Sequence, residues 1–240
     1  MLADRLDYVW GLTRASIREQ GFRHAARSMA VYSAALLRSR RIARRRFTFR
    51  NRTYPYFSNL YKMTWNTERA VEIPIARAAI EAHPAGRILE VGNVLSHYFP
   101  VGHEVVDKYE QAPGVLNQDV VAFQPDHRYD LIVSISTLEH VGWDEAEREP
   151  QKTLRAVAHL RSLLAPGGQL LITFPVGYNP WLDELFWAGR LPFDEATCLK
   201  RVTGDNRWTE VEREALRDTR YNAPFFCANG LVIGTSTAAP

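Results

Sequence analysis

The stretch that decides the fold is Arg87–Gly92, which reads Arg-Ile-Leu-Glu-Val-Gly. It is a short apolar run that ends at a glycine and follows a segment with a helical pattern. Three further apolar runs come after it, at Glu104–Asp107, Leu131–Ser136 and Leu170–Phe174. Continuous apolar runs separated by helical patterns indicate parallel strands that are buried on both faces. The sequence therefore predicts an α/β fold with a doubly wound, mostly parallel sheet.

The ends of these runs predict where a ligand binds. Sheets of this kind bind ligands outside the carboxyl ends of their strands. Gly92 closes the first run, Asp107 closes the second and Ser136 closes the third. We therefore expect the functional site at this edge of the sheet, with the segment Thr137–Val141 beside it.

Four pieces of sequence within residues 68–174 share the motifs of one family. They are Leu89–Gly92, Val106–Asp107, Tyr129–Ser134 and Leu164–Gly168. In these pieces the chain resembles the class I S-adenosylmethionine-dependent methyltransferases. The resemblance implies a Rossmann-like sheet with a late antiparallel strand, expected at residues 225–234, and S-adenosyl-L-methionine as the cofactor.

The glycine-rich loop of that family is incomplete here. The family usually has Glu/Asp-x-Gly-x-Gly-x-Gly, whereas Val94 and Ser96 replace the second and third glycines. This departure motivates an alternative, a non-catalytic methyltransferase-like domain that serves as a binding or scaffold protein. A dinucleotide site is disfavoured because Gly92–His97 does not satisfy G-x-G-x-x-G. Hydrolase and phosphoryl-transfer functions lack support, since the chain has neither a G-x-S-x-G motif nor a P-loop.

The resemblance assigns cofactor contacts to six residues. Glu90 would fix the loop and the methionyl end, and Gly92 would let the backbone approach the cofactor closely. Asp107 would accept hydrogen bonds from the ribose hydroxyls, and Asp119 would contact the adenine amino group. Ser136 would lie beside the methionyl part. The full cofactor-binding set is Glu90, Gly92, Asn93, Asp107, Asp119 and Ser136.

His140 is the candidate catalytic residue, because it follows the third apolar run. A neutral imidazole can accept a proton near pH 7, and an alcohol must lose its proton as it is methylated. We therefore expect His140 to act as general base in O-methylation of a small-molecule or glycan-like acceptor. The alternative is a histidine that is hydrogen-bonded for structure. The glycan option depends on Trp143, Trp181 and Trp187, which could stack on a sugar. No histidine spacing typical of a metal site is found.

Charge is distributed unevenly along the 240 residues. Residues 1–50 contain 12 Lys and Arg and 3 Asp and Glu, a net charge of +9, while the remainder contains 18 and 24, a net charge of −6. We expect a basic helical N-terminal segment with a small hairpin over residues 1–57 and a methyltransferase-like domain over residues 58–240. The arginine cluster at residues 38–46 suggests peripheral contact with an anionic membrane. The alternative is a solvated helical face. Nucleic acid is a weaker partner, because no aromatic-interleaved basic motif is present.

Cysteine usage and apolar runs bear on the compartment. Cys198 and Cys227 form no C-x-x-C pair, so a disulfide framework is unsupported and a reducing cytoplasm is the default. The start of the chain lacks the pattern of a signal peptide. The apolar run at residues 29–37 is too short to cross a bilayer, which takes about 20 helical residues. We therefore expect a cytoplasmic enzyme with peripheral membrane contact.

Overall fold

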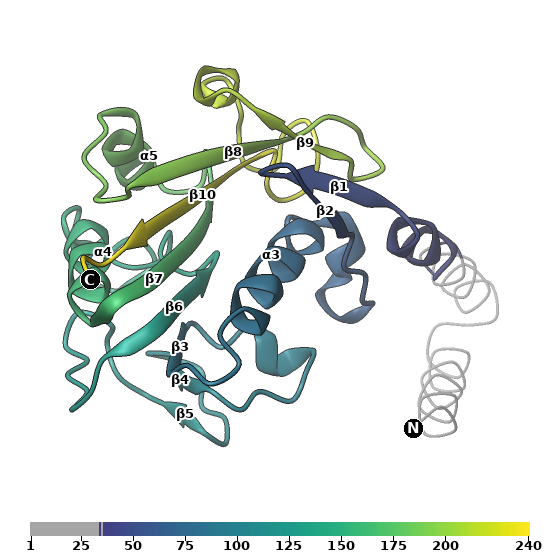
Figure 1. Cartoon of the computed structure of the whole chain (residues 1–240). Helices are drawn as coiled ribbons and strands as arrows, with labels where there is room; N and C mark the ends of the chain where they lie inside the picture. The colour runs from purple at the N-terminus through teal and green to yellow at the C-terminus, as the bar shows by residue number, and fades with distance from the viewer. Residues whose placement is uncertain (1–33, 35) are drawn as a thin grey trace, which may run out of the picture.

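The computed structural model describes residue 34 and residues 36–240. Most of the helical segment predicted for residues 1–46 therefore lies outside the described part. The remainder of that segment forms a helix over residues 36–43, which leads into the first strand (Figure 1). Within the described residues, no helix is long and apolar enough to cross a membrane.

The predicted hairpin is present. Strand β1 (Arg46–Phe49) pairs in antiparallel register with β2 (Arg52–Pro55). Arg50 and Asn51 form the two-residue turn with φ angles of 48° and 60°. Positive φ at both turn residues gives a twist that matches the flanking strands. Phe47 and Phe49, the two inward side chains of β1, are buried against the main sheet.

The main sheet has eight strands in the order β5-β4-β3-β6-β7-β10-β8-β9. Its parallel half consists of β3 (Ile88–Val91), β4 (Glu104–Val106), β5 (Val115–Leu116), β6 (Tyr129–Ile135) and β7 (Leu164–Pro175). The chain moves outward from β3 to β5 and then crosses back to β6. This reversal between β3 and β6 is the kind of switch point at which such sheets bind ligands.

The other half of the sheet is antiparallel. Strand β10 (Gly230–Thr237) lies between β7 and β8 (Glu195–Arg201) and runs opposite to both, and β9 (Trp208–Val211) runs opposite to β8. The expected late antiparallel strand is confirmed, although it begins at Gly230 and not at residue 225. The apolar segment 120–123 is a turn and not a strand, since the third strand along the parallel part of the chain is β5.

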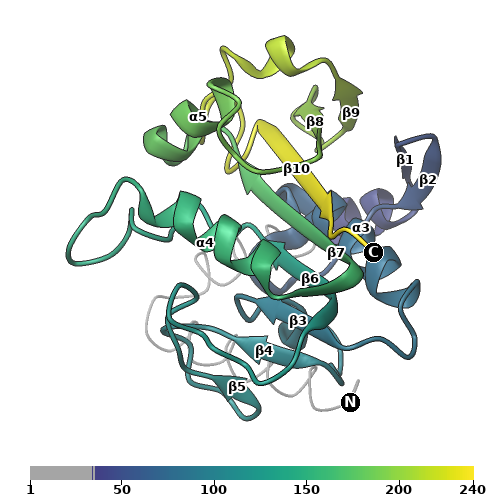
Figure 2. The ribbon, with the colours of Figure 1, turned by 60° about the vertical axis from the view of Figure 1, so that its left-hand side comes forward.

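Helices cover both faces of the sheet, which confirms the doubly wound prediction. On one face α4 (Lys152–Ser162) and α5 (Pro180–Trp187) pack against Ile132 and other apolar strand residues. On the opposite face α3 (Arg69–Glu81) packs against the cluster that contains Leu131. Because successive strand residues point to opposite faces, a strand buried on both sides is apolar throughout. Figure 2 shows α4 in front of the sheet and α3 behind it.

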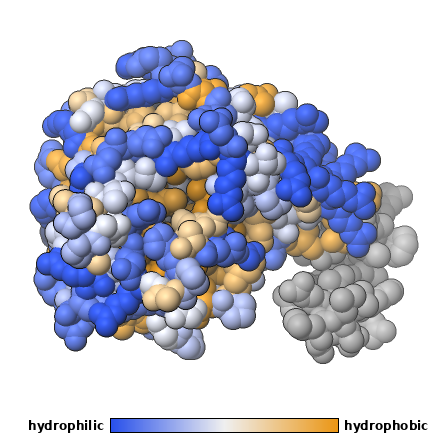
Figure 3. All heavy atoms as spheres, viewed as in Figure 1, coloured by the Kyte–Doolittle hydropathy of each residue, from blue (hydrophilic) through white to orange (hydrophobic). Residues whose placement is uncertain are grey.

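Short 3₁₀ helices fill several connections: η1 (Tyr61–Asn66), η2 (Leu95–His97) and η3 (Arg213–Leu216). The element η2 follows Gly92 in the connection between β3 and β4. Hydrophilic side chains cover much of the face in Figure 3, including its right-hand side over the helix that precedes β1. Beneath this surface, the buried apolar side chains form two main layers, one on each face of the sheet.

Candidate functional site

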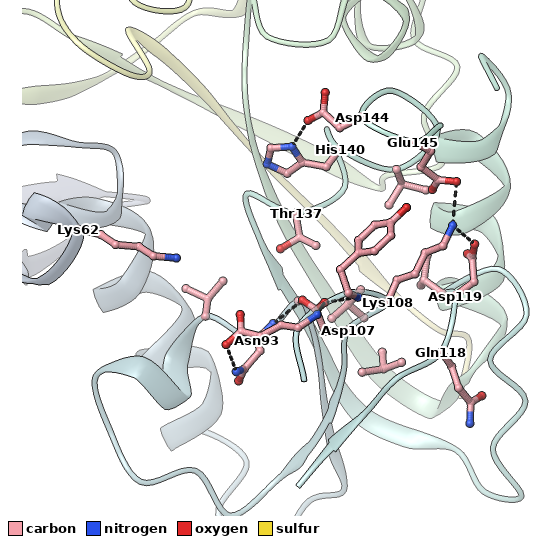
Figure 4. A pocket seen from close by; sticks show the side chains of 18 residues that line it. Lys62, Asn93, Asp107, Lys108, Gln118, Asp119, Thr137, His140, Asp144 and Glu145 are labelled. Carbon is pink, nitrogen blue, oxygen red and sulfur yellow. Dashed lines mark hydrogen bonds and ion pairs between the residues drawn. The ribbon is translucent and has the colours of Figure 1, made fainter. Parts of the chain in front are cut away.

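A cavity of about 490 Å³ opens at the carboxyl ends of β3, β4 and β6. This is the edge at which the sequence predicts the site. Polar residues that line it include Asn93, Asp107, Asp119, Thr137, His140 and Asp144. In Figure 4, Asn93 and Asp107 lie at one end of the cavity, while His140 and Asp144 lie at the other.

Glu90 organises the loop after β3 from within. Its side chain is fully buried, at 0% exposed. Oε1 accepts hydrogen bonds from the backbone N–H groups of Val94 (2.9 Å) and Leu95 (2.8 Å), and Oε2 lies 2.8 Å from Nε2 of His103. The carboxylate thus satisfies the N–H groups at the start of η2, which agrees with its predicted role in the loop. It does not line the cavity, so the predicted contact with a methionyl group has no support in this geometry.

Gly92 brings the loop against the turn after β6. Its φ angle is +86°, a conformation that favours glycine. A Cβ atom at this position would overlap the side chain of Thr137. Gly92 therefore permits the close approach that was predicted for it, and the nearest neighbour is Thr137. Thr137 lines the cavity, but nothing in the sequence pattern singles it out.

Asp107 is held by backbone donors at the end of β4. Its Oδ1 accepts from the N–H groups of Tyr109 and Glu110, both at 2.8 Å, and its Oδ2 accepts from the N–H of Asn93 at 3.1 Å. Because a carboxylate offers about four lone-pair sites, Oδ2 retains capacity for one more donor. Asn93 also donates through Nδ2 to Glu110 Oε1 at 2.8 Å. These contacts tie β3 to β4 across the cavity floor.

Asp119 belongs to a cluster of four charged side chains. Its Oδ2 lies 2.6 Å from Nζ of Lys152 and 2.9 Å from Nζ of Lys108. Both lysines also contact Glu145. Burial alone would raise the pKa of Asp119, but the hydrogen bonds from the two lysines outweigh it and lower the pKa to about 2. Asp119 lines the cavity at the predicted edge of the sheet, and its Oδ2 is already paired with the two lysines. Lys108, Glu145 and Lys152 were not predicted as site residues.

The structure places Ser136 away from the cavity. Its backbone has a φ angle of +37°, and its hydroxyl donates to Oε1 of Glu72 on α3. Glu72 is fully buried and also accepts from Thr173 Oγ1 at 2.6 Å. The left-handed turn after β6 directs this side chain toward α3, and it is Thr137 that faces the cavity. Ser136 therefore does not line this cavity, and its expected place beside the methionyl part stays a prediction.

His140 is oriented by two side chains. Its Nδ1 lies 2.5 Å from Oδ2 of Asp144, and the hydroxyl of Tyr178 donates to the same oxygen at 2.5 Å. The rings of His140 and Tyr178 also meet edge to face, with centroids 4.9 Å apart. A contact with a carboxylate places the hydrogen of a neutral imidazole on Nδ1, which leaves Nε2 as the acceptor. Nε2 lies 3.7 Å from Oε1 of Glu139.

The sequence analysis did not identify Asp144 or Tyr178 as site residues. Burial alone would raise the pKa of Asp144, but hydrogen bonds from His140 and Tyr178 lower it below its ordinary value. Asp144 is therefore an anion at neutral pH. The four-residue spacing of His140 and Asp144 was a usable signal, whereas Tyr178 is 34 residues from its partner.

The tryptophans that suggested a sugar platform have covered faces. The guanidinium of Arg148 lies 4.1 Å from the ring centroid of Trp143, and Trp181 meets the same ring edge-on at 5.0 Å. The guanidinium of Arg217 lies 4.7 Å from the ring centroid of Trp187. These contacts occupy part of the aromatic surface that stacking on a sugar would use, and the glycan acceptor stays a prediction.

The cavity is electronegative. Five carboxylates and two lysines line it, which gives a formal net charge of −3; they are Asp107, Glu110, Asp119, Asp144, Glu145, Lys62 and Lys108. Lys152, which does not line the cavity, lies 2.6 Å from Asp119 and Glu145 and offsets part of this charge. Carboxylates still outnumber lysines, and such an excess attracts ligands of the opposite sign. Within the described part of the chain, no group of three or more His, Cys, Asp or Glu side chains is arranged to hold a metal ion.

Comparison with known proteins gives structural similarities only. No protein-family model matches the chain, and no curated protein is similar to it. The N-methyltransferase NodS from Bradyrhizobium japonicum WM9, solved with S-adenosyl-L-homocysteine, is 14% identical over 72% of this chain and 88% of that chain, with a TM-score of 0.46. The chain is similar to methyltransferases.

Two further structures are of the same kind. A methyltransferase from Thermotoga maritima, described as a possible histamine N-methyltransferase, is 15% identical over 70% of this chain and 89% of that chain, with a TM-score of 0.44. The 1,6-didemethyltoxoflavin-N1-methyltransferase of Burkholderia thailandensis is 14% identical over 81% and 98%, with a TM-score of 0.40. At these identities no residue role passes from one protein to the other, and each site residue is assessed by its own contacts.

Proposed function

We propose that this protein is an S-adenosylmethionine-dependent methyltransferase that acts on a small-molecule acceptor. The observation that carries the proposal is the electronegative cavity at the switch point between β3 and β6. S-adenosylmethionine is a cation with a sulfonium and an ammonium group, which suits a cavity of net charge −3. A dinucleotide with its pyrophosphate would be repelled by the same carboxylates.

The chain offers candidate holders for the nucleoside part of this cofactor. Asp107 keeps one lone pair of Oδ2 available for a ribose hydroxyl. Asp119 also lines the cavity, and we assign it the contact with the adenine amino group. Gly92 allows close approach of the backbone. The incomplete glycine motif is a weak reason for a scaffold function, because Glu90 holds the same loop through two backbone N–H groups. The cofactor supplies an electrophilic methyl group, and the protein mainly has to align the acceptor with it. Alignment is worth up to roughly 7–11 kcal/mol of a reaction barrier.

We infer that the methyl group goes to an oxygen, with His140 as general base. A hydroxyl must give up its proton as the new carbon–oxygen bond forms, and Nε2 of His140 is the acceptor atom that faces the site. Asp144 holds Nδ1–H and stabilises the imidazolium that results. Tyr178 in turn fixes Asp144. We favour a small molecule over a glycan, because contacts with Arg148 and Trp181 occupy part of the surface of Trp143.

Calorimetry with S-adenosylmethionine and S-adenosylhomocysteine tests this function. We expect both to bind. S-adenosylmethionine should lose more affinity as salt is added, because its sulfur is charged whereas that of S-adenosylhomocysteine is neutral. A scaffold without a cofactor site should bind neither. Incubation of the wild type with a metabolite extract and a labelled methyl donor should then transfer label to a small molecule. The His140→Ala variant serves as the matched control for that transfer.

A further inference from the structure

A second hollow, which we call the arginine groove, lies between the helix at 36–43 and η1. It has a volume of about 310 Å³, and its polar lining consists of Arg38, Arg41, Arg45, Trp65, Asn66 and Asp205. None of these residues lines the larger cavity. The element η1 nevertheless joins the two, because its Lys62 lines the cavity while its C-terminal residues line the groove.

The groove is electropositive and only partly neutralised. Arg45 is tied to Asp205 by contacts of 2.7 Å to Oδ2 and 2.9 Å to the backbone carbonyl. Arg38 and Arg41 project from exposed positions of the helix, and within the described residues no ion pair involves either of them. Three arginines against one aspartate give a formal net charge of +2. The groove therefore has opposite polarity to the cavity.

A buried donor in the groove wall lacks a partner. Trp65 is 8% exposed, and its Nε1–H has no hydrogen-bond acceptor among the described residues. A buried donor without an acceptor is costly, and buried tryptophan N–H groups usually find a partner. The neighbouring Asn66 has its carbonyl and side-chain oxygens occupied by Arg201, so it does not serve as that acceptor. Trp65 lines the groove, so an acceptor bound there would lie beside a side chain that has a donor to offer.

We propose that the arginine groove binds a phosphate group, such as that of an anionic lipid headgroup. Guanidinium groups pair with phosphate oxygens through two parallel hydrogen bonds, which gives them a preference for this anion. The helix that carries Arg38 and Arg41 belongs to the segment of residues 1–50, whose net charge is +9. That charge draws the chain toward an anionic surface, where the groove can receive a headgroup. In Figure 3 many of the side chains in the region of this helix are hydrophilic, although Leu37 of the helix is 60% exposed.

Two matched double variants separate a specific site from general attraction. One is Arg38→Gln with Arg41→Gln in the groove. The other is Arg40→Gln with Arg44→Gln, on exposed positions of the same segment that do not line the groove. General attraction loses about fivefold in affinity for each charge removed, whichever arginine is changed. Both variants should unfold at the temperature of the wild type and bind S-adenosylmethionine equally well.

Binding is measured by co-sedimentation with phosphatidylcholine vesicles that contain phosphatidic acid, and by calorimetry with inorganic phosphate. We expect the groove variant to lose at least tenfold more vesicle affinity than the control variant, because it also loses paired hydrogen bonds. If only inorganic phosphate distinguishes the variants, the site takes a soluble phosphate, which still supports the proposal. Equal losses on vesicles together with no groove-dependent phosphate binding would overturn it.

Discussion

The two ends of the cavity are built in different ways. At the cofactor end, the carboxylate of Asp107 is held by three backbone N–H groups, so its position is set by the strands and their turns. At the acceptor end, His140 is held by the side chains of Asp144 and Tyr178, and 47% of its own side chain is exposed. Backbone-held groups are pre-organised, whereas side-chain contacts can be lost singly. The first end is therefore suited to binding and the second to proton transfer.

The two ends also differ in how they respond to pH. The pKa of Asp119 near the cofactor end is lowered to about 2, because its two lysine partners outweigh its burial. Asp183 supports the turn that carries Tyr178 by accepting the N–H of Gly177 at 2.9 Å. Burial raises the pKa of Asp183 to about 6, since that one hydrogen bond does not offset the loss of water. Of these two groups, only Asp183, which supports the acceptor end, changes its charge between pH 4 and pH 7.

Removal of the imidazole should produce the largest effect. His140→Ala should lower turnover by roughly 10²–10⁴-fold, the usual range for a lost general base. The affinity for S-adenosylmethionine should stay near that of the wild type, because the cofactor is held from the other end. Turnover and calorimetry on the same preparation measure both quantities. A parallel loss of turnover and affinity would show that His140 has a structural role and that the two ends are not separate.

The next effect concerns the group that orients His140. Asp144→Asn replaces a charge-assisted hydrogen bond to Nδ1, which is worth roughly 1.5–3 kcal/mol, so turnover should fall by about 10- to 100-fold. Tyr178→Phe leaves the carboxylate in place and serves as the milder control. The pH profile of turnover should shift in the Asp144 variant and should stay like that of the wild type in the Tyr178 variant. An unchanged pH profile in both would contradict an orienting role for Asp144.

At the cofactor end the expected effect is on binding. Asp107→Ala removes the acceptor of the ribose hydroxyls, so the affinity for S-adenosylmethionine should drop by about tenfold or more. Turnover at saturating cofactor should change much less than in His140→Ala. Calorimetry and steady-state kinetics separate these two outcomes. Unchanged affinity in a folded Asp107→Ala protein would remove Asp107 from the cofactor site.

The smallest effect is on stability and depends on pH. Because the folded pKa of Asp183 is raised to about 6, the folded state binds its proton more tightly than the unfolded state does. Ionised Asp183 therefore weakens the fold above pH 6, and this penalty disappears as the pH falls below 4. Asp183→Asn should raise the free energy of unfolding by roughly 1–2 kcal/mol at pH 7.5 and by nothing at pH 4.

Denaturant titrations at the two pH values measure this difference. Asp119→Asn is the matched control of opposite sign, because its lowered pKa makes the ionised form stabilising above pH 4. That variant should be less stable than the wild type at pH 7.5. If both aspartate variants shift stability in the same direction, the contrast between the two ends is wrong.

The sequence alone determined the framework of this protein. The apolar runs of β3, β6 and β7 predicted buried parallel strands, and the residues at the ends of β3 and β4, Gly92 and Asp107, line the predicted edge. These predictions succeed because hydrophobic periodicity is local, and because the chain leaves every parallel strand at the same edge of the sheet.

Only the tertiary structure decided where the polar side chains point. Ser136 turns toward Glu72, which is 64 residues away, and Thr137 faces the cavity in its place. Asp144 contacts His140, and Tyr178 reaches the same carboxylate from the turn after β7. Such contacts depend on turn conformation and on residues distant in sequence, and neither leaves a periodic signal in the chain. The strands could therefore be located from the sequence, whereas the orientation of His140 required the assembled fold.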